Sequence, residues 1–199
     1  IYLSGDTRRA TIYNSVWSKL YRRAVVKDLL FPAGRNSEDI LYTTKAFRRM
    51  DRCIYVDVPL YHYVSDRSGS IMNEKKGARR LSDEIPFWKE QIAYLREEGL
   101  TKEADLAACA FYRRMLFYDR DFRAEESMLA YAEKLEELLA ADKDEIRRIY
   151  EGASVKKGDR MRMRLFLISP KLYDRWAGWY EEKIIPLRQR LRRSRAGAE

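Results

Sequence analysis

The chain has 199 residues, of which 46% are hydrophobic and 13% aromatic; this argues against disorder and leaves room for one large or two small folded domains. Two cysteines are too few for a disulfide framework, so a reducing cytoplasm is the simplest setting. The formal net charge is +9, and no stretch reaches the roughly 20 apolar residues that cross a bilayer.

The first 75 or so residues mix helix and strand signals. Asn14 is expected to cap a short helix whose apolar face includes Trp17, and Ser37 is expected to cap a helix that begins at Glu38 and Asp39. Residues 53–58 alternate apolar and polar side chains, which predicts a strand.

From about residue 76 onward the hydrophobic period is helical. Gly99 suits the position just after a helix, and further helices are expected from Thr101, over residues 124–139 and over residues 143–150. The apolar stripe that ends before Gly99 contains Leu81, Ile85, Trp88, Ile92 and Leu95, with Pro86 at a start or kink. Residues 152–158 are the expected joint before the C-terminal segment.

The positive charge is concentrated in residues 156–199, which hold 13 basic and 5 acidic residues. Ser169 and Pro170 predict a helix start, and Pro186 is expected to break the helix that follows. Aromatic and basic residues alternate along this helix, as is typical of helices that lie at an anionic membrane surface. Packing of the aromatic side chains on the domain is the second interpretation, and nucleic-acid binding ranks last.

Three strings near the N-terminus carry more specific information. They are VWSKLYRR (residues 16–23), FPAGRNSED (residues 31–39) and VPLYHYVSDRSGSIMNEK (residues 58–75). In this order and spacing the chain resembles the second half of bacterial family 2 glycosyltransferases with the GT-A fold. The resemblance covers roughly residues 10–75 and weakens in the helical part that follows.

The resemblance implies that Asp39 is the catalytic base and that Glu38 shapes the acceptor pocket. An inverting sugar transfer needs a carboxylate that takes the proton from the acceptor hydroxyl, and the first turn of a helix favours an ionised carboxylate. A serine followed by acidic residues at a helix start, as in Ser37-Glu38-Asp39, is also an ordinary capping arrangement.

The resemblance also implies substrate-binding positions outside this pair. Trp17 and Lys19 would lie near the sugar, His62 would stack on substrate, and Arg67 and Ser70 would close over the nucleotide diphosphate. The competing interpretations are a core tryptophan, a solvated lysine and a plain surface turn. No metal site is expected within this segment, because no second histidine lies near His62.

The fold class expected is therefore α-rich α+β: the C-terminal remnant of a GT-A α/β domain, a helical domain and a basic amphipathic C-terminal helix. The expected boundaries are 1–75 for the acceptor-side part, 76–155 for the helical domain and 156–199 for the basic tail. In the family, an N-terminal half with an Asp-x-Asp motif binds the nucleotide-sugar through a divalent cation, Mg²⁺ or Mn²⁺. That half would precede Ile1, and residues 1–199 alone are not expected to catalyse sugar transfer.

The function implied by the resemblance is sugar transfer from a nucleotide-sugar to a polysaccharide or lipid-linked acceptor, at the inner face of a bacterial membrane. Residues 160–195 would hold the intact enzyme on the anionic membrane surface from the cytoplasmic side. The alternative is a non-catalytic membrane-surface adaptor or partner module without its own donor site. Whether an Asp-x-Asp half precedes Ile1 in the reading frame distinguishes the two.

Overall fold

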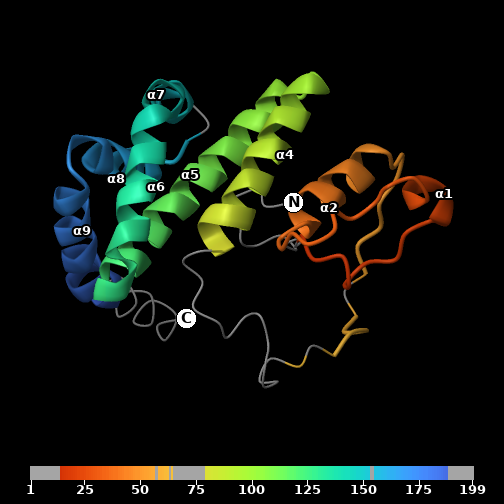
Figure 1. The fold of residues 1–199 in the computed structure, drawn as a ribbon, viewed down its shortest axis with the longest axis horizontal. Helices are drawn as coiled ribbons and strands as arrows, with labels where there is room; N and C mark the ends of the chain where they lie inside the picture. The colour runs from red at the N-terminus through yellow and green to blue at the C-terminus, as the bar shows by residue number, and fades with distance from the viewer. Residues whose placement is uncertain (1–13, 57, 63, 65–78, 153–154, 188–199) are drawn as a thin grey trace, which may run out of the picture. The chain divides into compact units, whose positions relative to one another are not determined.

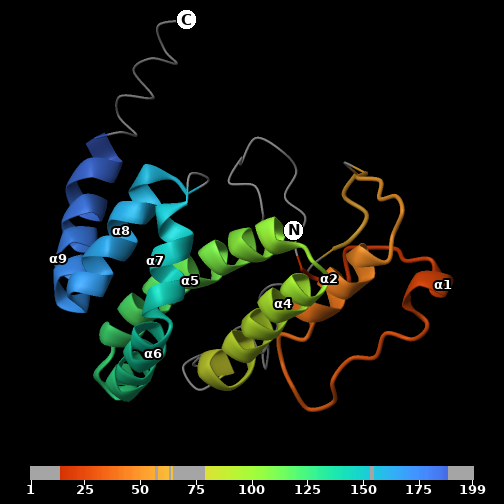
Figure 2. The same cartoon turned by 90° about the horizontal axis from the view of Figure 1, so that it is seen from above.

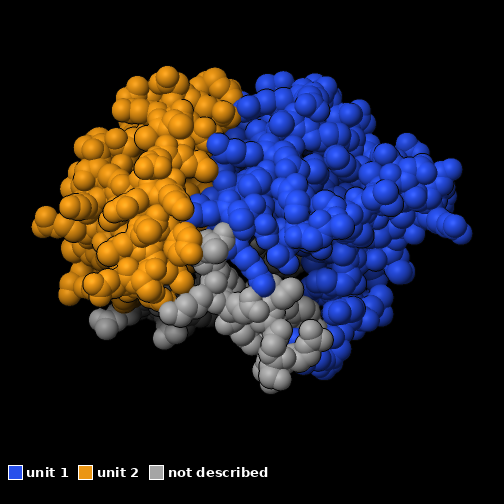
Figure 3. Space-filling model, in the orientation of Figure 1, with its two compact units in different colours: residues 1–111 blue, residues 112–199 orange. Residues whose placement is uncertain are grey.

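The computed structural model describes residues 14–56, 58–62, 64, 79–152 and 155–187. Two compact units are formed, residues 1–111 (unit 1) and residues 112–199 (unit 2), and the long helix α5 passes from one into the other (Figure 3). The helices are α1 (Arg23–Val26), α2 (Asp39–Arg48), α4 (Ile85–Glu97), α5 (Thr101–Arg123), α6 (Leu129–Ala141), α7 (Lys143–Glu151), α8 (Lys157–Ile168) and α9 (Pro170–Trp179) (Figure 1).

Unit 1 is built around the packing of α2 against α4. The predicted apolar stripe on α4 is confirmed at Ile85, Trp88, Ile92 and Leu95, all of which are buried. Between the two helices the buried Gln91 side-chain amide donates to Thr44 Oγ1 at 2.5 Å. This bond satisfies the Nε2 side of the amide and ties α2 to α4, while the buried Oε1 of Gln91 has no hydrogen-bond partner among the described residues.

The ends of α4 follow local backbone rules. A π-helical turn (Arg80–Glu84) leads into α4, and Pro86 lies in its first turn. At the other end Gly99 has φ +72°, the left-handed conformation that lets a helix stop, as the sequence predicts. The amide of the following residue, Leu100, donates back to the Leu95 carbonyl at 2.8 Å.

Unit 2 contains the second part of α5 together with α6 to α9. Its core is formed by large side chains that are almost completely buried, among them Phe122, Leu135, Leu139, Ile146, Met163 and Tyr173. Helices α8 and α9 lie side by side (Figure 1, Figure 2), and the Phe166 and Tyr173 rings meet edge to face with centroids 5.8 Å apart. The helix predicted over residues 143–150 is confirmed as α7.

The start of α9 is the one that the sequence predicts. Ser169 is the N-cap residue, its hydroxyl accepts from the Leu172 amide at 3.3 Å, and Pro170 is the first helical residue. The expected break at Pro186 is wrong, because residues 185–187 remain helical. A π-helical turn (Tyr180–Ile184) directly precedes this proline and changes the hydrogen-bond register where a proline would otherwise interrupt the helix.

The α-rich part of the expected fold class is confirmed, and the β part is corrected. In the described part of residues 53–58 there is no strand, and Ile54 is 85% exposed. Alternation predicts a strand only where a neighbouring strand completes the ladder and one face is covered, and the described residues supply neither.

Three predicted helix starts also need correction. Residues 14–22 form turns, and the helix that follows them, α1, begins only at Arg23. Ser37 has φ +67° and does not cap α2; Glu38 is the N-cap residue, while Asn36 just before is bonded to Asp83 at 2.9 Å. The helix predicted from residue 124 begins with a 3₁₀ turn (Glu126–Met128) and continues as α6.

The predicted domain division at residues 75 and 155 stays a prediction. The two compact units are divided between residues 111 and 112. Among the described residues, no helix combines the length and the apolar character that a membrane crossing requires.

Candidate functional site

The most distinctive charged group of unit 1 is the carboxyl of Asp39, the first residue of α2. Partial burial raises the pKa of this carboxyl, and the negative charge of neighbouring Glu38 raises it further. The backbone amide of Ile40 and the charge of Lys19 act in the opposite direction. A carboxylate with a raised pKa holds a proton more strongly than an exposed one, which is the property of a general base.

Lys19 lies close enough to Asp39 for their charges to interact. Burial lowers the pKa of the Lys19 ammonium, while Asp39 and then Cys53 favour its charged form. Its Nζ atom donates to the Ser15 carbonyl at 2.5 Å and lies 3.3 Å from Ser18 Oγ. These contacts hold the lysine inside the turn of residues 14–22.

That turn is itself attached to α2. The buried Thr43 hydroxyl, one helical turn after Asp39, donates to the Asn14 carbonyl at 2.5 Å. This bond fixes the position of the turn relative to the N-terminal end of α2, and so places Lys19 beside Asp39.

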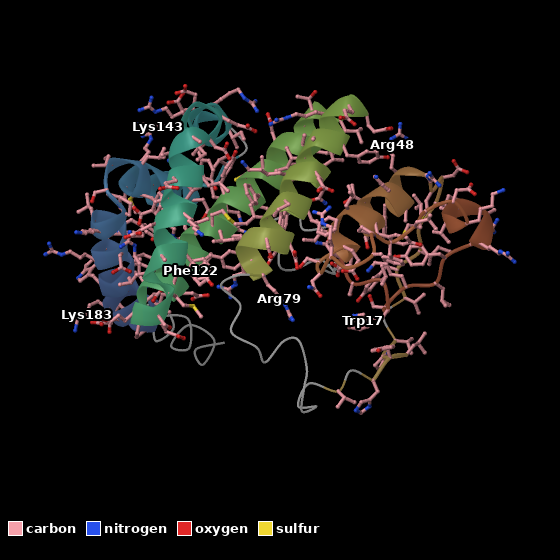
Figure 4. All side chains as sticks on the ribbon, viewed as in Figure 1. Trp17, Arg48, Arg79, Phe122, Lys143 and Lys183 are labelled. Carbon is pink, nitrogen blue, oxygen red and sulfur yellow. The ribbon has the colours of Figure 1, made fainter. Side chains whose placement is uncertain are left out.

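Trp17, in the same turn, forms an accessible aromatic pair with Tyr61. The rings of Trp17 and Tyr61 lie 4.5 Å apart between centroids and are inclined by 31°. Trp17, labelled in Figure 4, is 47% exposed and Tyr61 is 53% exposed, so both keep ring surface open to a ligand. His62 follows Tyr61 and is exposed.

A cleft of about 870 Å³ opens along the face of α2 that carries Tyr42 and Lys45, and Glu38 is among its lining residues. Asp39, the next residue, is not among them. One of its walls carries Phe31 and Tyr42, whose rings stack with centroids 4.0 Å apart and planes within 11°. The facing wall is α4, with Phe87, Glu90, Tyr94 and Glu98.

Two ion pairs connect the walls of this cleft. Arg35 bonds Glu90 at 2.9 Å and lies 3.8 Å from the centroid of the Phe87 ring. Arg48, labelled in Figure 4, bonds Glu98 at 2.9 Å. Of the aromatic rings in this cleft, Phe31 is exposed, Tyr42 and Tyr94 are half-buried, and Phe87 is buried. The paired charges offer donors and acceptors, and the Phe31 ring offers flat apolar surface, which together suit a polyhydroxylated ligand.

The structure brings together part of the predicted site. Asp39, Glu38 and Lys19 share the N-terminal end of α2, and Trp17 lies on the same turn as Lys19. His62, which follows Tyr61, is exposed. Arg67 and Ser70 lie outside the described residues.

Sequence reasoning missed three members of this site. Cys53 and Tyr21 interact electrostatically with Lys19 or Asp39, and Tyr61 supplies the partner ring of Trp17. Cys53 and Tyr61 are more than 30 residues from Trp17 along the chain. No local pattern marks Cys53, and the string that contains Tyr61 does not show that its ring pairs with Trp17.

In the part of the chain that the structure describes, no three His, Cys, Asp or Glu side chains are grouped as metal ligands. The chain contains two Asp-x-Asp strings, at residues 119–121 and 142–144, and their carboxylates make contacts within the helical part of the chain. Asp119 is fully buried and bonds Arg123, while Asp142 accepts from the Tyr112 hydroxyl at 3.2 Å and Asp144 forms an exposed ion pair with Arg147.

Comparison with known proteins adds no relative to these observations: no protein-family model, no curated protein and no solved structure matches the chain.

Proposed function

We propose that the chain is the acceptor-side part of an inverting glycosyltransferase that moves a sugar from a nucleotide-sugar to a polysaccharide or lipid-linked acceptor. The observation that carries the proposal is the partly buried Asp39 carboxyl, whose pKa is raised, at the N-terminal end of α2 beside Lys19. The resemblance of residues 10–75 to family 2 glycosyltransferases supports it independently of the geometry.

Asp39 is the general base of the proposed reaction. Its carboxylate takes the proton from the acceptor hydroxyl as that oxygen forms a bond to the anomeric carbon. The bond from the anomeric carbon to the nucleotide diphosphate breaks at the same time, the diphosphate leaves with the electron pair, and the configuration inverts. Lys19 limits the rise in the pKa of Asp39, so that the carboxylate form remains available to accept the proton.

The surrounding surfaces have roles in this proposal that follow from their chemistry. The rings of Trp17 and Tyr61 present a platform for the apolar face of a sugar ring. The cleft that Glu38 helps to line receives the acceptor along α2, and its two ion pairs supply hydrogen-bond donors and acceptors to hydroxyl groups.

The divalent cation and the donor site of the intact enzyme belong, by the resemblance, to the N-terminal half. The described residues hold no group of ligands that fits a divalent cation, so no step is assigned to one here.

The test uses the full-length protein that contains these residues, with the common uridine, guanosine and thymidine diphosphate sugars as donors and membrane-extracted glycans as acceptors. Transfer is measured as glycan product and as released nucleoside diphosphate. Asp39→Asn should lower the rate by about 10²- to 10⁴-fold, since general base catalysis contributes that much. The control is Asp51→Asn, which removes the same charge from an exposed residue just after α2.

Wild-type rates in Asp39→Asn would overturn the proposal. Absence of transfer by the wild-type protein with every donor would also overturn it, and would favour the non-catalytic adaptor.

A further inference from the structure

Helix α9 has one face that is packed and one that is not. Tyr173 and Ala177, four residues apart, are 2% and 5% exposed and form the packed face. The opposite face, continued into the π-helical turn after α9, carries residues that we call the outer stripe: Lys171, Leu172, Arg175, Trp179 and Lys183. Leu172 is 43% exposed and Trp179 is 53% exposed, and Arg175 and Lys183 are exposed as well.

Two of the three acidic residues of this segment turn away from the outer stripe. Arg120 on α5 bonds Asp174 at 3.3 Å and Glu181 at 2.5 Å. Asp174 and Glu181 are therefore paired with Arg120 on the α5 side, whereas the third carboxylate of this segment, Glu182, is exposed. The structure thus holds two of the three anions on the side of α5, and the cations of the outer stripe lie beside exposed Leu172 and Trp179.

A second ring pair strengthens the orientation of the helix. Trp176 and Tyr180 stack with centroids 5.1 Å apart, and the Arg162 guanidinium of α8 lies 5.9 Å and 5.6 Å from the two ring centroids. These rings are held against α8, whereas Trp179, between them in sequence, points outward. The outer stripe is consequently a fixed feature of unit 2.

We infer that the outer stripe is a docking face for an anionic lipid bilayer, on which α9 lies parallel to the surface. Exposed Trp and Leu side chains enter the region between headgroups and acyl chains, where indole rings are preferred. Lys171, Arg175 and Lys183 meet the lipid phosphates, and the ion pairs of Asp174 and Glu181 with Arg120 reduce the repulsion that these two acids would cause. This inference does not rest on the proposed sugar transfer.

The experiment measures co-sedimentation of the 199-residue chain with large unilamellar vesicles at low and high salt. One set of vesicles contains phosphatidylcholine alone, and the other also contains about 30% phosphatidylglycerol, which makes the surface anionic. Binding should require the anionic lipid and should weaken with salt. The variant Lys171→Gln/Arg175→Gln/Lys183→Gln should bind on the order of 100-fold more weakly, because each cation near an anionic surface contributes about 1 kcal/mol, or a factor of about five.

The matched control is Lys134→Gln/Lys143→Gln/Arg147→Gln, which removes three exposed cations from α6 and α7 of the same unit. It should keep near wild-type binding, and circular dichroism of both triple variants should match the wild type. Vesicles with brominated lipid should quench tryptophan fluorescence, and Trp179→Phe should remove most of that quenching.

Equal loss of binding in the two triple variants would overturn the inference, because net charge alone would then explain it. So would unchanged quenching in Trp179→Phe, self-association of the chain without vesicle binding, or preferential binding to duplex DNA or RNA. None of these readouts depends on enzymatic activity, so failure here leaves the transfer proposal untouched.

Discussion

The Asp39 carboxyl lies between neighbours of opposite charge, Glu38 and Lys19, and both act on its pKa. The Glu38 charge raises that pKa, so Glu38→Gln should lower it. Lys19 lowers it, so Lys19→Met should raise it. Carbon-13 NMR titration of the side-chain carboxyl in the 199-residue chain, with the signal assigned through Asp39→Asn, measures all three values.

Opposite shifts in the two variants are the expected result, with the wild-type pKa above the 3.8 of an ordinary aspartate. Asp51→Asn serves as the control and should leave the titration of Asp39 where it is. A wild-type pKa at or below 3.8 would contradict the account of this site.

Asp119 in unit 2 provides a second titration with a consequence for stability. Burial raises its pKa to about 6, although Arg123 acts against the shift. The folded protein therefore holds this proton at pH values where the unfolded chain has lost it. As pH rises from about 4 to about 6, this carboxyl should reduce the free energy of unfolding, on the order of 2–3 kcal/mol in total.

Asp119→Asn cannot ionise and should remove this part of the pH dependence. At pH 7 its free energy of unfolding, measured by urea denaturation, should equal or exceed that of the wild type. Arg123 retains Glu136 as an ion-pair partner in the variant. A loss of more than about 1 kcal/mol at pH 7 would show that the bond from Asp119 to Arg123 outweighs the cost of burying the carboxylate.

At the scale of elements, the N-cap of α9 offers a direct test. Ser169→Ala removes the hydroxyl that accepts from the Leu172 amide and should cost about 1 kcal/mol of stability. The control is Ser127→Ala, an exposed serine inside a 3₁₀ turn that caps no helix. Thermal unfolding of both variants gives the comparison, and an equal effect of the two would contradict the capping role.

The helices were largely predictable because their signals are local. Each signal lies within a few residues of the feature that it predicts. Examples are the apolar stripe of α4, the glycine after that helix and the Ser-Pro start of α9. The predicted strand failed because a strand depends on a partner that residues 53–58 do not reveal. Pro86 and Pro186 each lie two residues after a π-helical turn. Such a turn accommodates the missing amide hydrogen of proline within a helix, and the sequence pattern does not predict it.

The site was predictable only in part, for the same reason. Asp39 and Glu38 are marked by a helix start, and Lys19 and Trp17 by a motif. The position of Cys53 near Lys19 and the pairing of Tyr61 with Trp17 arise from tertiary folding. Likewise, only the bonds from Arg120 to Asp174 and Glu181 reveal which face of α9 is exposed.

At the scale of the whole molecule, the two units carry different candidate surfaces. Unit 1 carries the acidic site at the start of α2 and the cleft along it, and unit 2 carries the outer stripe of α9. The boundary between the units lies inside α5, whose sequence is continuous in helical period, so composition alone does not locate it.

The most direct test of the central claim is the pH dependence of kcat/KM for sugar transfer by the full-length protein. If Asp39 is the base, the rate should fall at acidic pH, with a midpoint that equals the Asp39 pKa measured by NMR and lies above 3.8. A midpoint that differs from the Asp39 titration, or a rate that does not fall as Asp39 becomes protonated, would contradict the claim.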